Sequence, residues 1–160
     1  MRVLGIDPGY AIVGVGVVDY NGNAFKVVNY DAITTKAGTD FNYRLQIIYD
    51  NMCKIIDTYK PEYMSIEKLF FNTNSTTAIS VAQARGVILL AAKQKGVKIY
   101  EYTPLQVKQA VTGYGKAEKR QVMELTKMLL GLKEIPKPDD TADALALAIC
   151  HAHSASSPLI

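Results

Sequence analysis

The sequence predicts an α/β domain in which a five-stranded mixed sheet carries helices on both faces. Short apolar strands separated by turns open the chain, and segments with helical periodicity follow with single strands between them. The length of 160 residues matches one domain. We expect a single domain over residues 1–153 and a short, flexible C-terminal tail over 154–160.

The first three strands are predicted to form an antiparallel meander. Val3–Asp7 is a short apolar strand, and the Pro-Gly pair after it favours a turn. Ile12–Asp19 is the second strand, in which Gly14 and Gly16 leave one face small. An Asn-Gly pair, the strongest short hairpin signal, leads into the third strand, Phe25–Ile33.

Helices and strands alternate after the meander. Phe41–Tyr59 has helical periodicity, and Pro61 ends it. The apolar stripe of this helix is expected to comprise Leu45, Ile48, Met52, Ile55 and Tyr59. Tyr63–Ile66 is a fourth strand that carries Glu67 at its end, and Lys98–Tyr102 is the fifth. The other predicted helices are Thr76–Lys95, Pro104–Thr112, Lys116–Leu130 and Asp139–His153.

The predicted helix Thr76–Lys95 is apolar on nearly every face. A helix of this kind is normally covered on two sides. The sheet accounts for one side. Either another helix of the same chain or a second subunit would cover the other.

Composition excludes several classes of protein. Hydrophobic residues make up 49% and charged residues 21% of the chain, which is typical of a folded globular protein. No apolar run reaches the roughly 20 residues of a membrane span, and Asp7 comes too early for a signal peptide. Cys53 and Cys150 indicate reduced thiols, so we expect a cytoplasmic protein with no membrane association.

Charge is distributed unevenly along the chain. Residues 93–133 contain nine basic and three acidic side chains, whereas residues 134–160 contain one basic and four acidic side chains. A basic segment of this kind attracts polyanions, while the acidic one keeps carboxylates available for a cation. On charge alone, a solvated lysine-rich surface is the more common explanation.

Four carboxylates occupy positions typical of a catalytic site. Asp7 and Glu67 each end a predicted strand directly after an isoleucine, and Asp140 and Asp143 share one face of a helix start. Each acid alone has an ordinary structural explanation, such as a turn or a helix dipole. Together, clustered carboxylates would repel one another unless hard divalent cations compensated them. Spacing alone does not choose between Asp139 and Asp140.

Six short motifs occur in order along the chain. They are Gly5-Ile6-Asp7-Pro8-Gly9, Ile66-Glu67-Lys68-Leu69-Phe70, Gln83-Ala84-Arg85-Gly86, Gln106-Val107-Lys108-Gln109, Ala117-Glu118-Lys119 and Asp140-Thr141-Ala142-Asp143-Ala144-Leu145-Ala146. In this order and at this chain length they closely resemble the RuvC family, the bacterial crossover-junction endonucleases that resolve Holliday junctions. The resemblance extends from Arg2 to about His153.

The resemblance implies a ribonuclease-H-like fold, which agrees with the five predicted strands. It implies that Asp7, Glu67, Asp140 and Asp143 are catalytic metal ligands, and the Asp-x-x-Asp-Ala pattern selects Asp140 over Asp139. The implied cofactor is Mg²⁺, two ions per subunit, for which Mn²⁺ can substitute. Two such ions support phosphodiester hydrolysis by activating water and stabilising the leaving oxygen.

The resemblance also implies partners. A homodimer, with Thr76–Lys95 as its interface, would nick two opposed strands of four-way junction DNA symmetrically. Its products would carry 5′-phosphate and 3′-hydroxyl ends that a ligase can seal, in recombination and DNA repair. The family prefers a short thymine-containing sequence and works with the RuvA–RuvB branch-migration complex.

Several side chains are predicted to contact DNA. They are Phe70, Phe71, Asn74, Arg85, Lys108, Lys116 and Lys119. The aromatic pair follows Glu67 and can stack on an unpaired base, although we expect one ring of the pair to pack inward. Lys108 and Lys119 match basic positions of the family, and Lys119 is also a catalytic candidate. Lys116 and Arg120 are expected to bind the backbone generically or to be solvated.

Alternative functions remain open at this point. A sugar-kinase-like phosphotransferase opens with a similar strand and hairpin, but it needs a second domain and a nucleotide-binding motif. A catalytically silent junction-binding protein, or a nuclease of the same fold acting on RNA or other branched DNA, is the nearer alternative. A zinc site at Cys150, His151 and His153 is disfavoured because the three point in different directions from one helix.

Overall fold

The computed structural model describes residues 1–70 and 75–157 and contains the predicted five-stranded mixed sheet. The strands are β1 (Arg2–Asp7), β2 (Ile12–Tyr20), β3 (Phe25–Thr34), β4 (Tyr63–Glu67) and β5 (Lys98–Tyr102). Their order in the sheet is β3-β2-β1-β4-β5. The first three strands form the predicted antiparallel meander, whereas β4 and β5 run parallel to β1. The predicted α/β class is confirmed.

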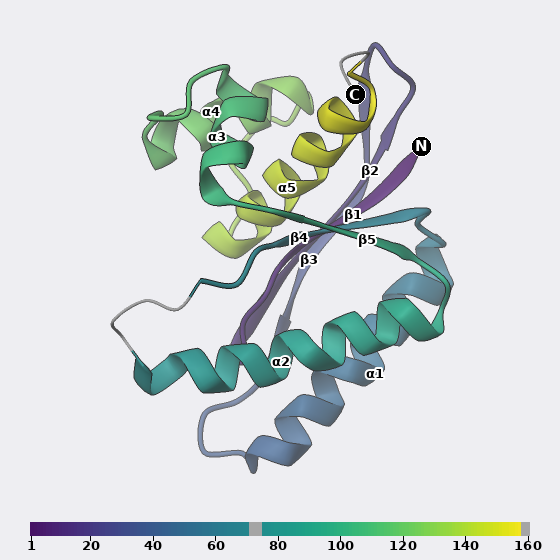
Figure 1. Cartoon of the computed structure of the whole chain (residues 1–160), viewed down its shortest axis with the longest axis vertical. Helices are drawn as coiled ribbons and strands as arrows, with labels where there is room; N and C mark the ends of the chain where they lie inside the picture. The colour runs from purple at the N-terminus through teal and green to yellow at the C-terminus, as the bar shows by residue number, and fades with distance from the viewer. Residues whose placement is uncertain (71–74, 158–160) are drawn as a thin grey trace.

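Helices cover both faces of the sheet (Figure 1). They are α1 (Phe41–Tyr59), α2 (Ser75–Gln94), α3 (Pro104–Thr112), α4 (Lys119–Leu129) and α5 (Asp139–Ala155). Leu4 and Ile6 of β1 share one core with Ile48 of α1 and Ile88 of α2. Val3, from the alternate side of the same strand, packs in a second core with α4 and α5. Because side chains alternate along a strand, Asp7 belongs to the α5 face.

Helix α5 lies directly on the sheet because glycines face it. A Cβ added to Gly5 would lie 1.8 Å from the carbonyl oxygen of Ala144, and one on Gly14 would lie 1.9 Å from the carbonyl oxygen of Asp140. Gly16 faces Leu145 in the same way. No side chain fits at these contacts. The small face predicted for the second strand is therefore the surface on which α5 packs.

The buried stripe of α1 differs in part from the predicted one. Ile48 and Met52 are buried as expected, but Ile56 rather than Ile55 continues the stripe, and Arg44 is buried at its start. Nε of Arg44 donates to the hydroxyl of Thr35 at 2.8 Å, which compensates this burial. Leu45, Ile55 and Tyr59 flank the stripe and are partly buried against the same core.

Two helix boundaries near the C-terminus also differ. Helix α4 begins at Lys119, not at the predicted Lys116, because the amide of Glu118 donates to the Gln121 side chain at 2.8 Å and starts the helix there. Helix α5 continues past the predicted His153 to Ala155. The flexible tail over 154–160 stays a prediction, since residues 158–160 lie outside the described part of the chain.

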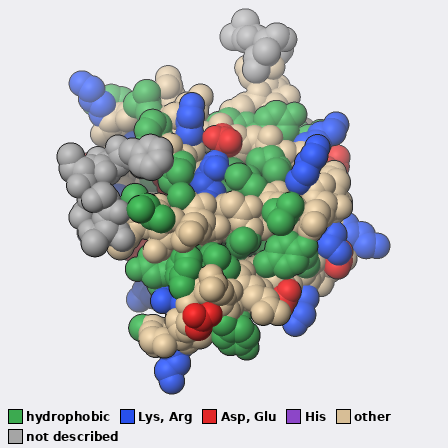
Figure 2. Space-filling model, turned by 60° about the horizontal axis from the view of Figure 1, so that its bottom comes forward, with side chains coloured by type: hydrophobic (Ala, Val, Ile, Leu, Met, Phe, Trp, Pro, Cys, Tyr) green, Lys and Arg blue, Asp and Glu red, His purple; other side chains and the backbone are tan. Residues whose placement is uncertain are grey.

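The outer face of α2 is not covered by another described helix of this chain. Ile79 is 66% exposed and Leu90 is 50% exposed, whereas Ala84 and Ile88 are buried against the sheet and α1. Figure 2, which turns α1 and α2 toward the viewer, shows hydrophobic side chains gathered on this face. Helix α1 packs against α2, so another helix of the same chain covers part of it, which was one of the two alternatives. A second subunit over Ile79 and Leu90 stays a prediction.

Among the described helices, none combines the length and the hydrophobicity of a membrane span. Both cysteines are free thiols, with Cys150 buried and Cys53 half-buried.

Candidate active site

The carboxylates of Asp7, Glu67 and Asp143 line one pocket of about 270 Å³. Asp7 and Glu67 converge because β1 and β4 are parallel neighbours, with Ile6 opposite Ile66, so their carboxyl ends lie side by side. Asp143 enters from the first turns of α5. The remaining lining residues come from α3, α4 and α5 and are Pro104, Val107, Lys108, Lys119, Val122, Ala146 and Leu147.

The acids perturb one another strongly. Burial, and then the charges of Asp143, Glu67 and Asp140, raise the pKa of Asp7 to about 8. Burial is also the largest cause of the raised pKa values of Glu67 and Asp143. The interaction between Asp7 and Asp143 raises the pKa of Asp7, whereas it favours the charged form of Asp143. Holding all these groups ionised at neutral pH therefore requires compensating positive charge.

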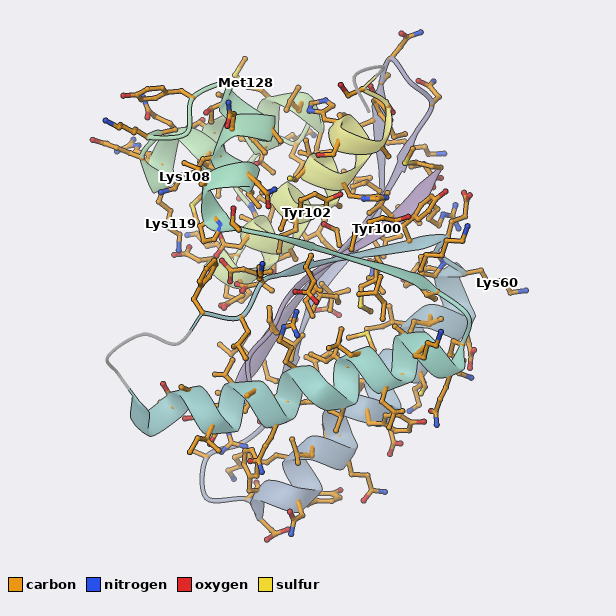
Figure 3. All side chains as sticks on the ribbon, in the orientation of Figure 1. Lys60, Tyr100, Tyr102, Lys108, Lys119 and Met128 are labelled. Carbon is orange, nitrogen blue, oxygen red and sulfur yellow. The ribbon has the colours of Figure 1, made fainter. Side chains whose placement is uncertain are left out.

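Lys119 supplies part of this positive charge from the first residue of α4. Its Nζ lies 3.7 Å from a carboxylate oxygen of Asp143 and 3.7 Å from one of Asp139. Burial opposes its charge, but the carboxylates of Asp143 and Asp139 more than offset this and raise the pKa of Lys119. Figure 3 shows Lys119 and Lys108 at the end of the sheet where β5 leads into α3.

The structure separates the two neighbouring acids at the start of α5. Asp140 is half-buried over Gly14, and its charge acts on Asp7. Asp139 is exposed and pairs with Lys119. Asp140 does not line the pocket itself. This placement supports Asp140, rather than Asp139, as the fourth acid.

The donor set fits a hard divalent cation. All donors are carboxylate oxygens, and the raised pKa values of Asp7, Glu67 and Asp143 reflect burial and repulsion that bound Mg²⁺ would relieve. Within the described part of the chain, no three His, Cys, Asp or Glu side chains already surround one point closely enough to bind an ion. The acids therefore lie close enough to repel one another, but they do not form a complete coordination shell.

Known proteins match the chain over nearly its whole length. The family model described as "Crossover junction endodeoxyribonuclease RuvC" matches residues 3–151. The chain belongs to this family. As a RuvC-family member it is a crossover junction endodeoxyribonuclease, a hydrolase of phosphodiester bonds with a ribonuclease-H-like fold.

Individual relatives agree with this assignment. The RuvC protein of Brevibacillus brevis is 62% identical over 152 residues, which cover 95% of this chain and 92% of the relative. That of Caldanaerobacter subterraneus is 60% identical over 154 residues, which cover 96% and 93%. Among solved structures, Thermus thermophilus RuvC in complex with a Holliday junction substrate matches with a TM-score of 0.93 and 37% identity, covering 98% of this chain and 95% of that one.

Phe70 of this RuvC-family chain lies on the loop after β4 and is 56% exposed. It lines a second hollow, of about 550 Å³, which shares Glu67 and Pro104 with the pocket of the acids. An exposed aromatic side chain thus stands next to the acids, as predicted for base stacking. Phe71 and Asn74, the other two predicted contacts in this loop, lie outside the described residues.

The predicted basic residues fall into two groups. Lys108 and Lys119 line the pocket of the acids. Lys116 and Arg120 are exposed beside the start of α4 and do not line it, which agrees with a generic role. Arg85 differs from both groups, because it is buried inside α2 rather than displayed at the surface where DNA contact was predicted.

The C-terminal histidines do not line the pocket of the acids. His151 is buried, its Nδ1 lies 2.7 Å from the Tyr102 hydroxyl, and burial lowers its pKa. Nδ1 of His153 donates to the carbonyl of Ala110 at 2.9 Å. Cys150 faces the core as expected. Within the described residues, these three side chains form no metal site.

Sequence reasoning missed the apolar wall of the pocket. Val107 and Val122 come from α3 and α4, and Leu147 comes from α5. Helical periodicity marks these residues as core but does not show which core residues border the acids. Glu101, which pairs with Arg85, was also missed because an exposed acid on a strand has no local signature.

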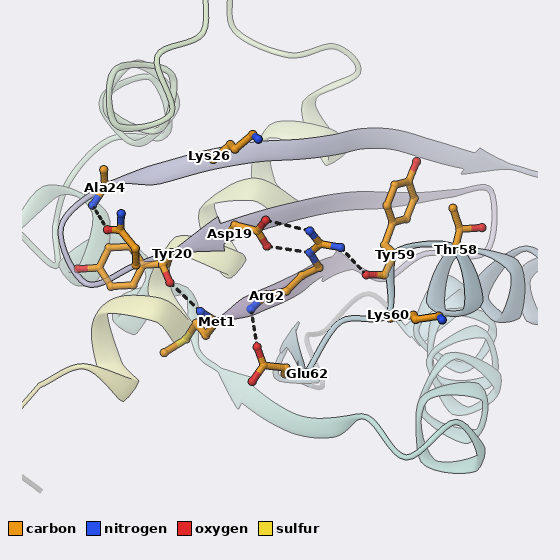
Figure 4. Close-up of a pocket in the computed structure, with 11 residues that line it drawn as sticks. Met1, Arg2, Asp19, Tyr20, Ala24, Lys26, Thr58, Tyr59, Lys60 and Glu62 are labelled. Atoms are coloured by element: carbon orange, nitrogen blue, oxygen red, sulfur yellow. Dashed lines mark hydrogen bonds and ion pairs between the residues drawn. The ribbon is translucent and has the colours of Figure 1, made fainter.

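A larger hollow of about 770 Å³ lies at the other end of β1, around Arg2 (Figure 4). Its main charged groups are already satisfied. Nε of Arg2 pairs with Asp19 at 2.7 Å, and Nη1 donates to the carbonyl of Tyr59 at 2.8 Å. The N-terminal amine donates to the carbonyl of Tyr20 at 2.7 Å. We interpret this end as a structural clamp of β1, β2 and α1, and the smaller pocket as the site of chemistry.

Proposed function

We propose that the chain resolves Holliday junctions by metal-dependent hydrolysis at the pocket of Asp7, Glu67 and Asp143. One observation carries this proposal. Acids from β1, β4 and α5, remote from one another in sequence, meet in one pocket that is rimmed by lysines. Buried repelling carboxylates are costly to the fold, so their convergence favours a catalytic role over a structural one.

Asp7, Glu67, Asp140 and Asp143 would hold two Mg²⁺ ions per subunit, for which Mn²⁺ can substitute. Bound there, the ions supply an activated water and charge stabilisation for the leaving oxygen. The protein holds the carboxylates in place through the parallel β1–β4 pair and through the seat of α5 on Gly14. The expected products carry 5′-phosphate and 3′-hydroxyl ends.

Lys119 neutralises negative charge beside Asp143, where the phosphate of the substrate would lie. Lys108, which lines the same pocket from α3, would bind the DNA backbone near the scissile bond. Lys116 and Arg120 extend this basic surface. Phe70, with Phe71 and Asn74 after it, would contact the unpaired bases at the crossover.

A homodimer through α2 completes the proposal. The exposed side chains of Ile79 and Leu90 give α2 an apolar outer face that a second copy would bury. Two sites related by twofold symmetry would nick opposed strands of the junction symmetrically. We further propose that the enzyme acts in the cytoplasm, in recombination and repair, together with the RuvA–RuvB branch-migration complex.

The test is strand cleavage of a synthetic four-way junction with a movable core, beside a linear duplex of the same sequence. Paired symmetric nicks in the junction only, abolished by EDTA and by Asp7→Asn, are the expected result. Tight junction binding without cleavage in Mg²⁺ or Mn²⁺ would leave a silent junction-binding protein. Equal cleavage of junction and duplex would leave a nuclease of the same fold without junction selectivity.

A further inference from the structure

Arg85 is a buried cation on the face of the sheet opposite to α5. Figure 1 shows its helix, α2, running beneath β4 and β5. The residue is only 8% exposed, and arginine stays protonated in proteins. A buried permanent charge must be compensated by nearby acceptors or opposite charges. The side chain therefore has a role inside the protein.

The contacts of Arg85 join the ends of two strands. Its Nε donates to the carbonyl oxygen of Glu67 at 3.4 Å, and its Nη2 lies 3.3 Å from Oε2 of Glu101. Nη2 makes no aligned hydrogen bond among the described residues, so the contact with Glu101 is a charge pair. Glu101 precedes Tyr102, and Tyr102 is paired with Glu67. The guanidinium thus joins the last residue of β4 to Glu101, the residue of β5 that lies opposite Ile66.

Glu67 depends on this side of the sheet for its position. The pairing of β4 with β1 ends at Ile6 and Ile66, whereas its pairing with β5 continues through Glu67 and Tyr102. The amide of Lys68 also donates to the carbonyl of Tyr102 at 2.9 Å. β4 ends at Glu67, and the chain leaves regular structure there. A group that binds both strand ends from the α2 face of the sheet would fix the direction in which the Glu67 carboxylate points.

We propose that Arg85 is a positioning residue that holds Glu67 at the metal-binding pocket, and that it does not bind DNA. Through its pair with Glu101, it clamps β4 to β5 from the side opposite the pocket. The inference rests on the proposed function in assigning Glu67 to metal binding. It deepens that function by adding a support outside the pocket to one of the four acids.

Three variants test this proposal, with one control. Arg85→Met removes the charge and keeps much of the side-chain length, and Arg85→Lys keeps the charge without the planar guanidinium group. Glu101→Gln neutralises the half-exposed partner. Lys93→Met, on an exposed position of the same helix, removes one positive charge elsewhere. Each protein is examined by Mn²⁺ binding without DNA, by junction affinity in EDTA at several salt concentrations, and by cleavage as a function of Mg²⁺.

Loss of a residue that orients a metal ligand typically weakens metal binding by about 10–100-fold. We expect Arg85→Met to weaken Mn²⁺ binding by at least about tenfold and to raise the Mg²⁺ concentration for half-maximal cleavage similarly. Junction affinity and its salt dependence should stay within about twofold of wild type. Arg85→Lys should recover part of the lost Mn²⁺ affinity. Glu101→Gln should weaken Mn²⁺ binding by about threefold, and Lys93→Met should leave it unchanged.

The opposite pattern would overturn the proposal. If Arg85→Met weakens junction binding and lowers the salt slope by about one, with Mn²⁺ affinity unchanged, Arg85 is a phosphate contact. If Arg85→Met does not fold, Glu101→Gln decides, and unchanged Mn²⁺ and Mg²⁺ dependence in that variant counts against the clamp. Absence of junction cleavage by the wild type would instead refute the proposed function, while Mn²⁺ binding would still test Arg85.

Discussion

Gly14 and the backbone of Asp140 are in direct contact: a Cβ on Gly14 would lie 1.9 Å from the Asp140 carbonyl oxygen. The glycine of β2 thus sets the depth at which the first turn of α5 lies on the sheet. Asp140 and Asp143 are carried by this turn. Strand β2 contributes no acid to the pocket, yet it determines how close these acids come to Asp7.

Gly14→Ala should therefore damage catalysis beyond its effect on folding. The methyl group pushes α5 outward, and a displacement near 1 Å of catalytic groups can cost about 100-fold in rate. Overpacking should also cost about 1–3 kcal/mol of stability. Junction cleavage at saturating Mg²⁺ and thermal unfolding measure the two effects separately.

Gly131→Ala is the matched control for this experiment. Gly131 has φ of +64° after α4, with open space around its Cβ position, so alanine there costs about 1–2 kcal/mol through backbone strain alone. It should lose stability and keep cleavage. If Gly14→Ala retains full cleavage at a temperature where it is folded, the depth of α5 does not govern the site.

Lys119→Ala should reduce cleavage more than junction binding. Its Nζ lies 3.7 Å from Asp143 within the pocket, so its charge acts where negative charge develops in the reaction. We expect the single-turnover rate to fall by at least about tenfold. Lys133→Ala, at an exposed position after α4, removes the same charge and should stay within about twofold. Equal rates in the two variants would exclude Lys119 from catalysis.

Leu90→Asp should dissociate the proposed dimer. A carboxylate on the outer face of α2 would be buried without a partner on association, which is strongly unfavourable. We expect a monomer in sedimentation at micromolar concentration and loss of paired nicking. Met128→Asp introduces the same charge at an exposed position of α4 and should leave the sedimenting species a dimer. Monomeric wild-type protein that still nicks in pairs would contradict the interface.

Local signals predicted the elements and most of the site, whereas tertiary contacts decided the remainder. Asp7 and Glu67 end strands, and strand ends can be recognised from apolar runs followed by turns. Arg85 could not be placed in the same way, because an arginine in an apolar helix can face solvent or a strand end. Arg44 is similar, since its burial depends on Thr35, which lies in the connection between β3 and α1.

The first residue of α4 also could not be predicted from local sequence signals. Helical periodicity does not distinguish Lys116 from Lys119 as the first residue, and the hydrogen bond between Glu118 and Gln121 decides it. The consequence reaches the active site, because a helix that starts at Lys119 places this side chain beside Asp143. The sequence also named Lys119 as a candidate, but only the capping contact explains why its side chain lies beside Asp143.

The repulsion among the acids should make the metal-free protein less stable as pH rises. The pKa of Asp7 is raised to about 8 in the folded protein, so the folded state binds a proton that the unfolded state releases near pH 4. The unfolded state then holds fewer protons between these values, and stability falls with rising pH until Asp7 ionises. Asp7→Asn removes the contribution of Asp7 to this dependence because asparagine stays neutral.

We therefore expect metal-free Asp7→Asn to be more stable than wild type at pH 9, by about 2 kcal/mol or roughly 5 °C in Tm. The two should converge near pH 4, and Asp50→Asn, at an exposed position of α1, should follow wild type throughout. Mg²⁺ should reverse the order at pH 9, since it stabilises the protein that binds it. Thermal unfolding from pH 4 to 9, in EDTA and in Mg²⁺, measures the difference at pH 9, the convergence near pH 4 and the effect of Mg²⁺. Parallel pH profiles for wild type and Asp7→Asn would show that Asp7 is charged at neutral pH without metal, which would contradict the raised pKa.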